Sequence, residues 1–122
     1  MIHDNIQIIL YVTGTITASM LLQFVAPARM LKVGNQLEVS DPVALFFARA
    51  AGLAIGLQGA LLIWAAADPA LRIPVVTVVA IGKTGFIGTV LLQSKSISKG
   101  YVLTMVFDTA CVLAYVAFLF GF

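Results

Sequence analysis

Long apolar stretches separated by short polar segments run through the whole chain. Four stretches contain few charged residues, and we place them at about residues 6–25, 43–66, 75–92 and 101–122. A helix needs about 20 mostly apolar residues to cross the hydrocarbon core of a bilayer, which is about 30 Å thick. Each stretch is therefore predicted to form a membrane-spanning helix.

The segments between the stretches contain residues that end or begin helices. Pro27 follows the first stretch. Asp41 is suited to cap the second helix, and Pro42 is suited to its first turn. Lipid offers the backbone no hydrogen bonds, and four short segments cannot close a barrel, so each segment is expected to be helical. The sequence predicts an all-α integral membrane protein: one domain over residues 1–122, a four-transmembrane-helix bundle with both termini on the same side.

The composition supports a membrane protein and excludes several other classes. Hydrophobic residues make up 61% of the chain and charged residues 10%, against about 45–50% and about 25% in soluble domains. No stretch has the polar face that a helix of a soluble bundle needs. The chain is too apolar to be disordered and has no basic patch for nucleic acid. The lipid bilayer is the predicted partner.

Metal and cofactor chemistry has little support in the sequence. The chain has one Cys and one His, and the His is at position 3, outside the four stretches. A single cysteine cannot build a disulfide framework or a cysteine zinc site, and haem ligation through imidazole is disfavoured. We expect no metal site and no cofactor.

The basic residues of the loops predict the orientation. Loop one, between the first and second spans, carries Arg29 and Lys32. Loop three, between the third and fourth spans, carries Lys95 and Lys99. Loop two, between the second and third spans, carries only Arg72. Cytoplasmic loops are enriched in Lys and Arg, so loops one and three are expected in the cytoplasm and both termini outside. The first residues lack the basic region of a signal peptide, so we expect the first span to be retained.

Three charged residues lie inside the spans: Arg49, Lys83 and Asp108. Each costs about 2.5–3.5 kcal/mol near the bilayer centre. At a rise of about 1.5 Å per residue, all three lie roughly 10–14 Å from the cytoplasmic ends of their helices. We predict a buried cluster in which Asp108 accepts from Arg49, Lys83 or both. The cluster is interpreted as a structural clasp or as a ligand or ion site, whose surplus positive charge would attract an anion. Independent snorkelling of the cations to the interface is the third interpretation.

Small and polar residues accompany this cluster. Gly52, Gly56 and Gly59 share one helix face with Arg49, and Gly82 and Gly85 flank Lys83. Glycines let helices approach closely in lipid, so these five are predicted packing positions. The glycine face of the second span is expected to pack either within the monomer or against a second copy. Secondary polar candidates are Gln23, Gln58, Thr84, Gln93, Thr104 and Tyr115.

Several short motifs in the second to fourth spans resemble a known group of proteins. They are Ala-Arg-Ala-Ala-Gly at residues 48–52, Gly56, Gly59, Ala-Ala-Ala-Asp-Pro at 65–69, Gly-Lys at 82–83 and Phe-Asp at 107–108. The chain resembles small four-span bacterial membrane proteins of the DoxX-like group. This resemblance implies the bacterial inner membrane and a subunit of a quinone-linked redox complex. The Arg and the Gly-x-x-Lys-like end usual in that group's first span are missing here, which disfavours quinone chemistry.

The leading functional hypothesis is a non-catalytic accessory or assembly subunit of a membrane complex. It rests on the small size, the lack of a soluble domain and the glycine-rich helix faces. The alternative is an oligomeric transporter or channel for a small ion or anionic solute, using Arg49, Lys83 and Asp108. An intramembrane enzyme is the third possibility, and no pairing of a nucleophile with a base supports it. A homo-oligomer or a membrane-protein partner is expected.

Overall fold

The computed structural model describes residues 2–122, and all secondary structure among them is helical. The α-helices are α1 (Ile6–Ala18), α2 (Leu21–Val25), α3 (Pro27–Asn35), α4 (Pro42–Ala67), α5 (Arg72–Leu91), α6 (Lys95–Ser98) and α7 (Val102–Leu119). Short 3₁₀ helices are η1 (His3–Asn5), η2 (Pro69–Leu71) and η3 (Lys99–Tyr101).

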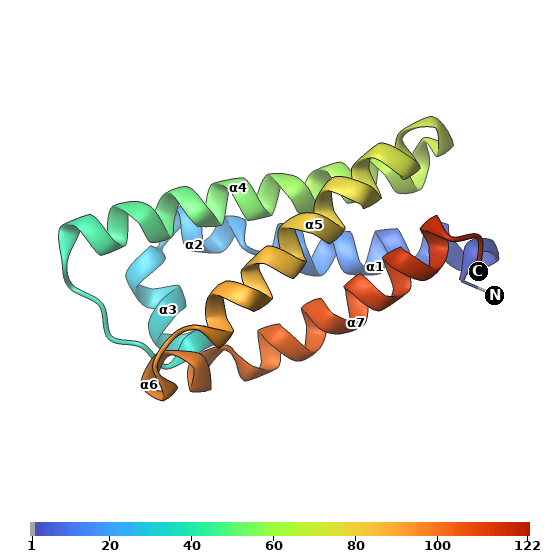
Figure 1. Ribbon diagram of the computed structural model, residues 1–122. Coiled ribbons are helices and arrows are strands. Elements are labelled where there is room, and N and C mark those ends of the chain that lie inside the picture. Colours follow the sequence, from blue (N-terminus) through green and yellow to red (C-terminus); the bar gives the residue numbers. More distant parts are fainter. Residues whose placement is uncertain (1) are drawn as a thin grey trace.

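Four helical runs are long and apolar enough to cross a membrane. They are Ile6–Val25, Pro42–Ala67, Pro69–Leu91 and Lys99–Leu119. These runs confirm the predicted all-α four-helix bundle of a multi-pass membrane protein. Figure 1 shows both chain termini at the same end of the bundle.

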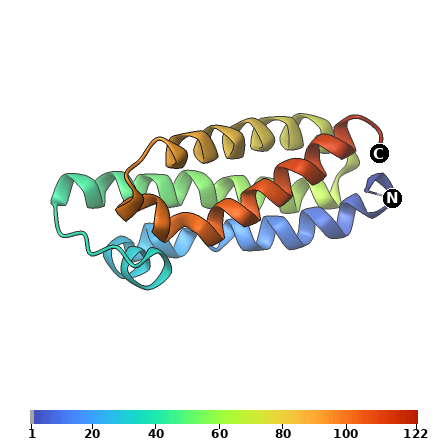
Figure 2. The same ribbon diagram turned by 60° about the horizontal axis from the view of Figure 1, so that its bottom comes forward.

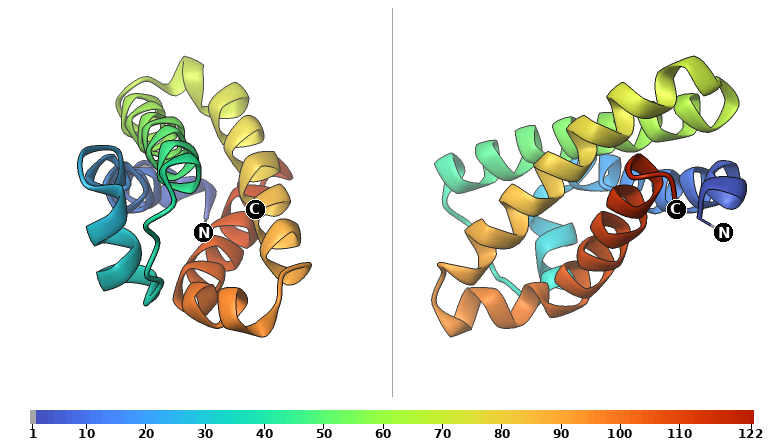
Figure 3. Two further views of the ribbon diagram at one scale, coloured as in Figure 1. Left: turned by 90° about the vertical axis from the view of Figure 1, so that its left-hand side faces the viewer. Right: turned by 45° about the vertical axis from the view of Figure 1, so that its right-hand side comes forward.

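The bundle consists of two helix pairs. In the first helix pair, α1 and α2 pack along α4, and in the second helix pair α5 packs along α7. The two pairs come together where α4 leads into α5 and diverge toward the end that carries α3 and α6 (Figures 1 and 2). Viewed along the bundle from that end, the two pairs stand apart (Figure 3, left).

The first span is interrupted by a turn. It is divided at Ser19 and Met20 into α1 and α2. Thr13, Thr15 and Thr17 each donate a hydrogen bond from the side chain to a carbonyl four residues earlier. Such bonds compete with the helix's own amides and bend helices. The interruption therefore follows directly after a run of hydroxyl residues that bond to their own helix.

Glycines on α4 allow α1 and α2 to lie directly against it. Gly52, Gly56 and Gly59 are buried. A Cβ atom at Gly52 would lie 2.7 Å from the amide nitrogen of Phe24, and one at Gly59 would overlap the backbone of Ala18. The structure thus supports packing of this face within the monomer.

Gly82 and Gly85 differ from the packing role expected of them. Both are exposed. A Cβ atom at Gly85 would meet nothing within 4 Å, and one at Gly82 would meet only the Gln58 amide, at 3.6 Å or more. The buried face of α5 instead consists of larger side chains, among them Val76, Val79 and Lys83. Neither glycine therefore provides a close helix contact within the described chain, because both lie on other sides of the helix than Lys83.

Loop one contains a helix that the sequence pattern did not predict. Pro27 begins α3 at its first turn, and the helix ends before Gln36, which has a left-handed φ of 58°. The Asn35 amide donates to the carbonyl of Gly100 at 3.1 Å. Loop one is therefore tied to the segment that precedes α7.

Polar residues cap the long helices. Asp41 accepts from the amide of Ala44 at 3.2 Å, which confirms it as the N-cap of α4. Arg72 donates to the carbonyls of Ala65 and Ala66 at 3.0 and 2.8 Å. Arg72 therefore satisfies carbonyls at the end of α4 that have no partner within the helix.

The packed apolar core occupies the half of the bundle near the termini. It includes Leu10 of α1, Leu62 of α4, Val79 of α5 and Tyr115 of α7. Leu10, Leu62 and Tyr115 have no exposed surface. All four spans therefore meet in this half, and the other half is built differently.

We predict that Gly59→Ala destabilises the bundle while Gly85→Ala does not. The added methyl group at Gly59 would collide with the backbone of Ala18, which cannot rotate away, whereas Gly85 has open space. Overpacking typically costs about 1–3 kcal/mol. Thermal unfolding of the two variants in the same detergent measures the difference. Equal midpoints would contradict the close α1–α4 contact.

Candidate functional site

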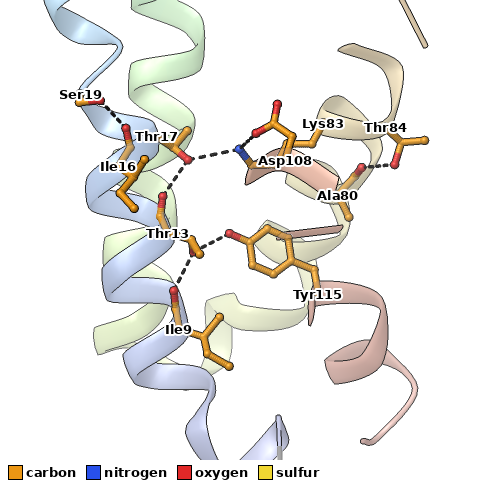
Figure 4. A network of polar contacts seen from close by, with 10 residues as sticks. All are labelled: Ile9, Thr13, Ile16, Thr17, Ser19, Ala80, Lys83, Thr84, Asp108 and Tyr115. Carbon is orange, nitrogen blue, oxygen red and sulfur yellow. Dashed lines mark hydrogen bonds and ion pairs between the residues drawn. The ribbon is translucent and has the colours of Figure 1, made fainter. Parts of the chain in front are cut away.

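A buried ion pair joins the two helices of the second helix pair. Lys83 Nζ on α5 lies 2.8 Å from Asp108 Oδ1 on α7, and the two side chains are only 6% and 9% exposed. Lys83 also donates to the hydroxyl of Thr17 on α1 at 3.3 Å. Its ammonium lies 5.0 Å from the ring centroid of Phe107. Figure 4 shows the contacts of Lys83 with Asp108 and with Thr17. Lys83 and Asp108 thus come together as the sequence predicted.

A second polar contact links α1 to α7 near the ion pair. The Tyr115 hydroxyl donates to Thr13 Oγ1 at 2.6 Å, and Thr13 donates to the carbonyl of Ile9 at 2.7 Å (Figure 4). A buried hydroxyl is costly unless it is hydrogen-bonded. Tyr115 is therefore a structural member of the polar network, inside the packed core.

Arg49 does not belong to the cluster, contrary to expectation. It is exposed, and among residues 2–122 it has no hydrogen bond or ion pair. The expected depth was wrong because α4 is longer than the helices beside it. Gly59 is the residue opposite Ala18, and Arg49 precedes Gly59 by ten residues, about 15 Å along the helix. The cluster is therefore a neutral ion pair without surplus positive charge.

A cavity of about 690 Å³ occupies the half of the bundle that has no packed core. Its inner end, nearest the core, is formed by Thr17, Lys83 and Asp108. Its walls are mainly apolar side chains of both helix pairs: Ile16, Met20, Ala44, Phe47, Ala51, Ile55, Phe86 and Phe107. Leu31 of α3 and residues 37–39 close part of the far end. The cavity exists because the two pairs diverge from the point where α4 meets α5.

The cavity is not fully enclosed, and several of the residues that line it are exposed. Phe47 of α4 is 64% exposed. Gly82 of α5 lies beside Gln58 of α4 and is exposed as well.

Besides Tyr115, which lies in the packed core, the secondary polar candidates divide into two groups. Gln23, Gln58 and Thr104 line the cavity, and Gln23 donates to the carbonyl of Ala48 at 2.7 Å. Thr84 and Gln93 bond only to carbonyls of their own helix, at Ala80 and Thr89, and do not line the cavity. Thr84 and Gln93 therefore have hydrogen-bond partners close by in the sequence and are not part of the site.

The cavity itself was missed by sequence reasoning. Its α4 wall has helical spacing, with Ala44, Ala48, Ala51, Ile55 and Gln58 on one face. The spacing of this face is visible in the sequence. However, an apolar face toward a cavity and an apolar face toward lipid have the same composition, so the pattern could not distinguish them.

No family model, no curated protein and no solved structure matches this chain. The arrangement of the cavity and the ion pair is therefore the basis for inferring a function.

We predict that single removal of either charge destabilises the protein more than removal of both. Asp108→Leu leaves the Lys83 ammonium buried without a counter-ion, which typically costs about 3–5 kcal/mol. The double variant Lys83→Met/Asp108→Leu leaves no buried charge. Thermal unfolding of both single variants and the double variant forms a double-mutant cycle.

Arg49→Gln is the matched control for this cycle, because it removes an intramembrane charge that has no partner among the described residues. Its unfolding midpoint should equal that of the wild type. Additive effects of Lys83→Met and Asp108→Leu would contradict the ion pair.

Proposed function

We propose that this chain is a non-catalytic membrane protein that holds a lipophilic small molecule in the cavity between its two helix pairs. The observation that carries this proposal is the cavity of about 690 Å³, with apolar walls and a neutral ion pair at its inner end. Sites for small ligands are typically apolar, about 300–1,000 Å³ in volume, and contain a few polar groups that orient the ligand.

The position of the cavity supports a ligand taken from the bilayer. Its lining residues Phe47, Ala51 and Phe86 belong to helical runs that are long and apolar enough to cross a membrane. A lipophilic molecule dissolved in the membrane would reach a cavity at this depth without passing through water. The proposed ligand is therefore a membrane-soluble molecule.

We propose that the protein performs this role as an accessory or assembly subunit of a membrane complex. The exposed glycines of α5 support a partner. A Cβ atom at Gly85 or Gly88 would meet nothing within 4 Å in the described chain. Small residues facing lipid allow the close approach of another helix. The partner is a second copy or another membrane protein.

Transport remains the alternative proposal. An oligomer that moves its ligand between membrane faces would use the same cavity. The neutral Lys83–Asp108 pair lacks the surplus positive charge that would favour an anionic solute. A membrane-soluble ligand suits this site better than an anion or a free ion.

For localisation we propose the bacterial inner membrane, with loops one and three in the cytoplasm. Arg29, Lys32, Lys95 and Lys99 all lie in these two loops. Arg72 is the only basic residue of loop two and bonds to the end of α4. This asymmetry supports the proposed orientation.

The cavity hypothesis is tested with an alkyl diazirine, a photoreactive hydrocarbon, in nanodiscs containing the purified protein. We expect saturable labelling of cavity residues, and we expect Ala51→Trp to reduce it by occupying part of the cavity. Ala50→Trp is the matched control, because Ala50 is exposed and does not line the cavity. Peptide mapping by mass spectrometry locates the label.

Labelling confined to the lipid-facing surface, or labelling that rises linearly without saturation, would overturn the proposed function. Equal labelling of the Ala51→Trp and Ala50→Trp variants would do the same.

The partner hypothesis is tested by cysteine cross-linking in native membranes. We expect Gly85→Cys to form an oxidative conjugate, because its face of α5 has room for a neighbouring helix. Leu113→Cys on α7 is the control at an exposed position, and the natural Cys111 is buried. The mass of the conjugate distinguishes a second copy from another protein. Equal conjugation at both positions would indicate random collision.

A further inference from the structure

The Asp108 carboxylate has one oxygen that the ion pair does not use. Oδ1 accepts from Lys83 at 2.8 Å. Among residues 2–122 no donor bonds to Oδ2, and every fully enclosed side-chain oxygen or nitrogen of those residues has a partner. Oδ2 is therefore accessible, although the side chain is only 9% exposed. Asp108 lines the inner end of the cavity, and in Figure 4 its second oxygen points away from Lys83.

Resting on the proposed function, we propose that Asp108 Oδ2 accepts a hydrogen bond from the hydroxyl group of a lipophilic alcohol or phenol. A buried acceptor without a donor is costly. A hydrogen bond to a carboxylate is stronger than one between neutral groups. The structure thus supplies an acceptor at the place where the head group of a bound molecule would lie.

The Lys83 ammonium at this end of the cavity is already engaged. Lys83 has three N–H groups. Two point to Asp108 and Thr17, and the ammonium also lies over the ring of Phe107. A head group that only accepts hydrogen bonds, such as an ether, an ester or a ketone, would leave Oδ2 unpaired.

Charged head groups fit the inner end less well than a hydroxyl. A carboxylate or phosphate would lie against the Asp108 carboxylate and be repelled. An ammonium would compete with Lys83 at close range. A neutral hydroxyl meets Asp108 without disturbing the ion pair.

Thr104 provides a second contact for the same hydroxyl. It lines the cavity one helical turn before Asp108, on the same face of α7. Its side-chain hydroxyl has no hydrogen bond among the described residues. A ligand hydroxyl can donate to Asp108 while it accepts from Thr104. Its hydrocarbon part then extends along Phe47, Ala51 and Ile55.

The test is competition against the alkyl diazirine in phosphatidylcholine nanodiscs. The competitors are 1-dodecanol and dodecyl methyl ether, which share a tail and differ in the hydroxyl proton, and each is compared at equal concentration in the bilayer. We expect 1-dodecanol to displace the label from cavity peptides at about tenfold lower concentration, the factor set by one hydrogen bond to a charged acceptor.

One variant assigns this preference to the ion pair. Lys83→Met/Asp108→Leu should equalise the two competitors. Thr104→Val is the comparison variant: an ether oxygen accepts from Thr104 as an alcohol oxygen does, so this variant should weaken both competitors and keep the preference for the alcohol. Thermal unfolding verifies that each variant is folded, and the wild-type comparison of alcohol and ether decides the outcome if the double variant does not fold.

Equal displacement by the alcohol and the ether in the wild type would overturn the head-group inference and leave the proposed function standing. An alcohol preference that survives in the folded double variant Lys83→Met/Asp108→Leu would also overturn it. Absence of saturable cavity labelling would overturn the proposed function itself, and the inference with it.

Discussion

The ion pair between Lys83 and Asp108 lies at the boundary between two different halves of the bundle. Toward the termini, all four spans pack into an apolar core that ends near Tyr115 and Ala80. Toward loops one and three, the helix pairs diverge around the cavity. An unpaired charge in the membrane interior is costly. The ion pair between the two side chains avoids this cost and holds α5 against α7 at that depth. The bond from Lys83 to Thr17 extends the constraint to α1.

Helix α4 has two faces with different roles. One of its faces consists of glycines that accept α1 and α2 at backbone contact. The adjacent face, with Ala51 and Ile55, forms a wall of the cavity. The glycine contacts hold the first helix pair closely together, while α5 and α7 diverge from it. The cavity lies between the two pairs.

Two of the three predicted site residues were recognisable because charges in apolar helices must be paired. That rule identified Lys83 and Asp108, and their separation of 25 residues placed them on successive spans. The same rule failed for Arg49, because α4 extends beyond its neighbours and the guanidinium lies outside the site. Depth along one helix is measurable from sequence, whereas the offset between helices depends on contacts such as Gly59 against Ala18. Gly82 and Gly85 were assigned to packing because composition does not reveal which face of a helix meets a neighbour.

The sequence by itself determined the class of protein, the approximate limits of its four spans, the Asp41 cap and the need for a buried ion pair. Each follows from local rules: hydrocarbon thickness, cap chemistry and the cost of a charge in lipid. Only the tertiary structure decided that α3 lies in loop one, that Arg49 is excluded and that a cavity exists beside Asp108. These features depend on the angle and offset between helices. In a membrane, lipid-facing and protein-facing surfaces are equally apolar, so the sequence pattern carries little information about that arrangement.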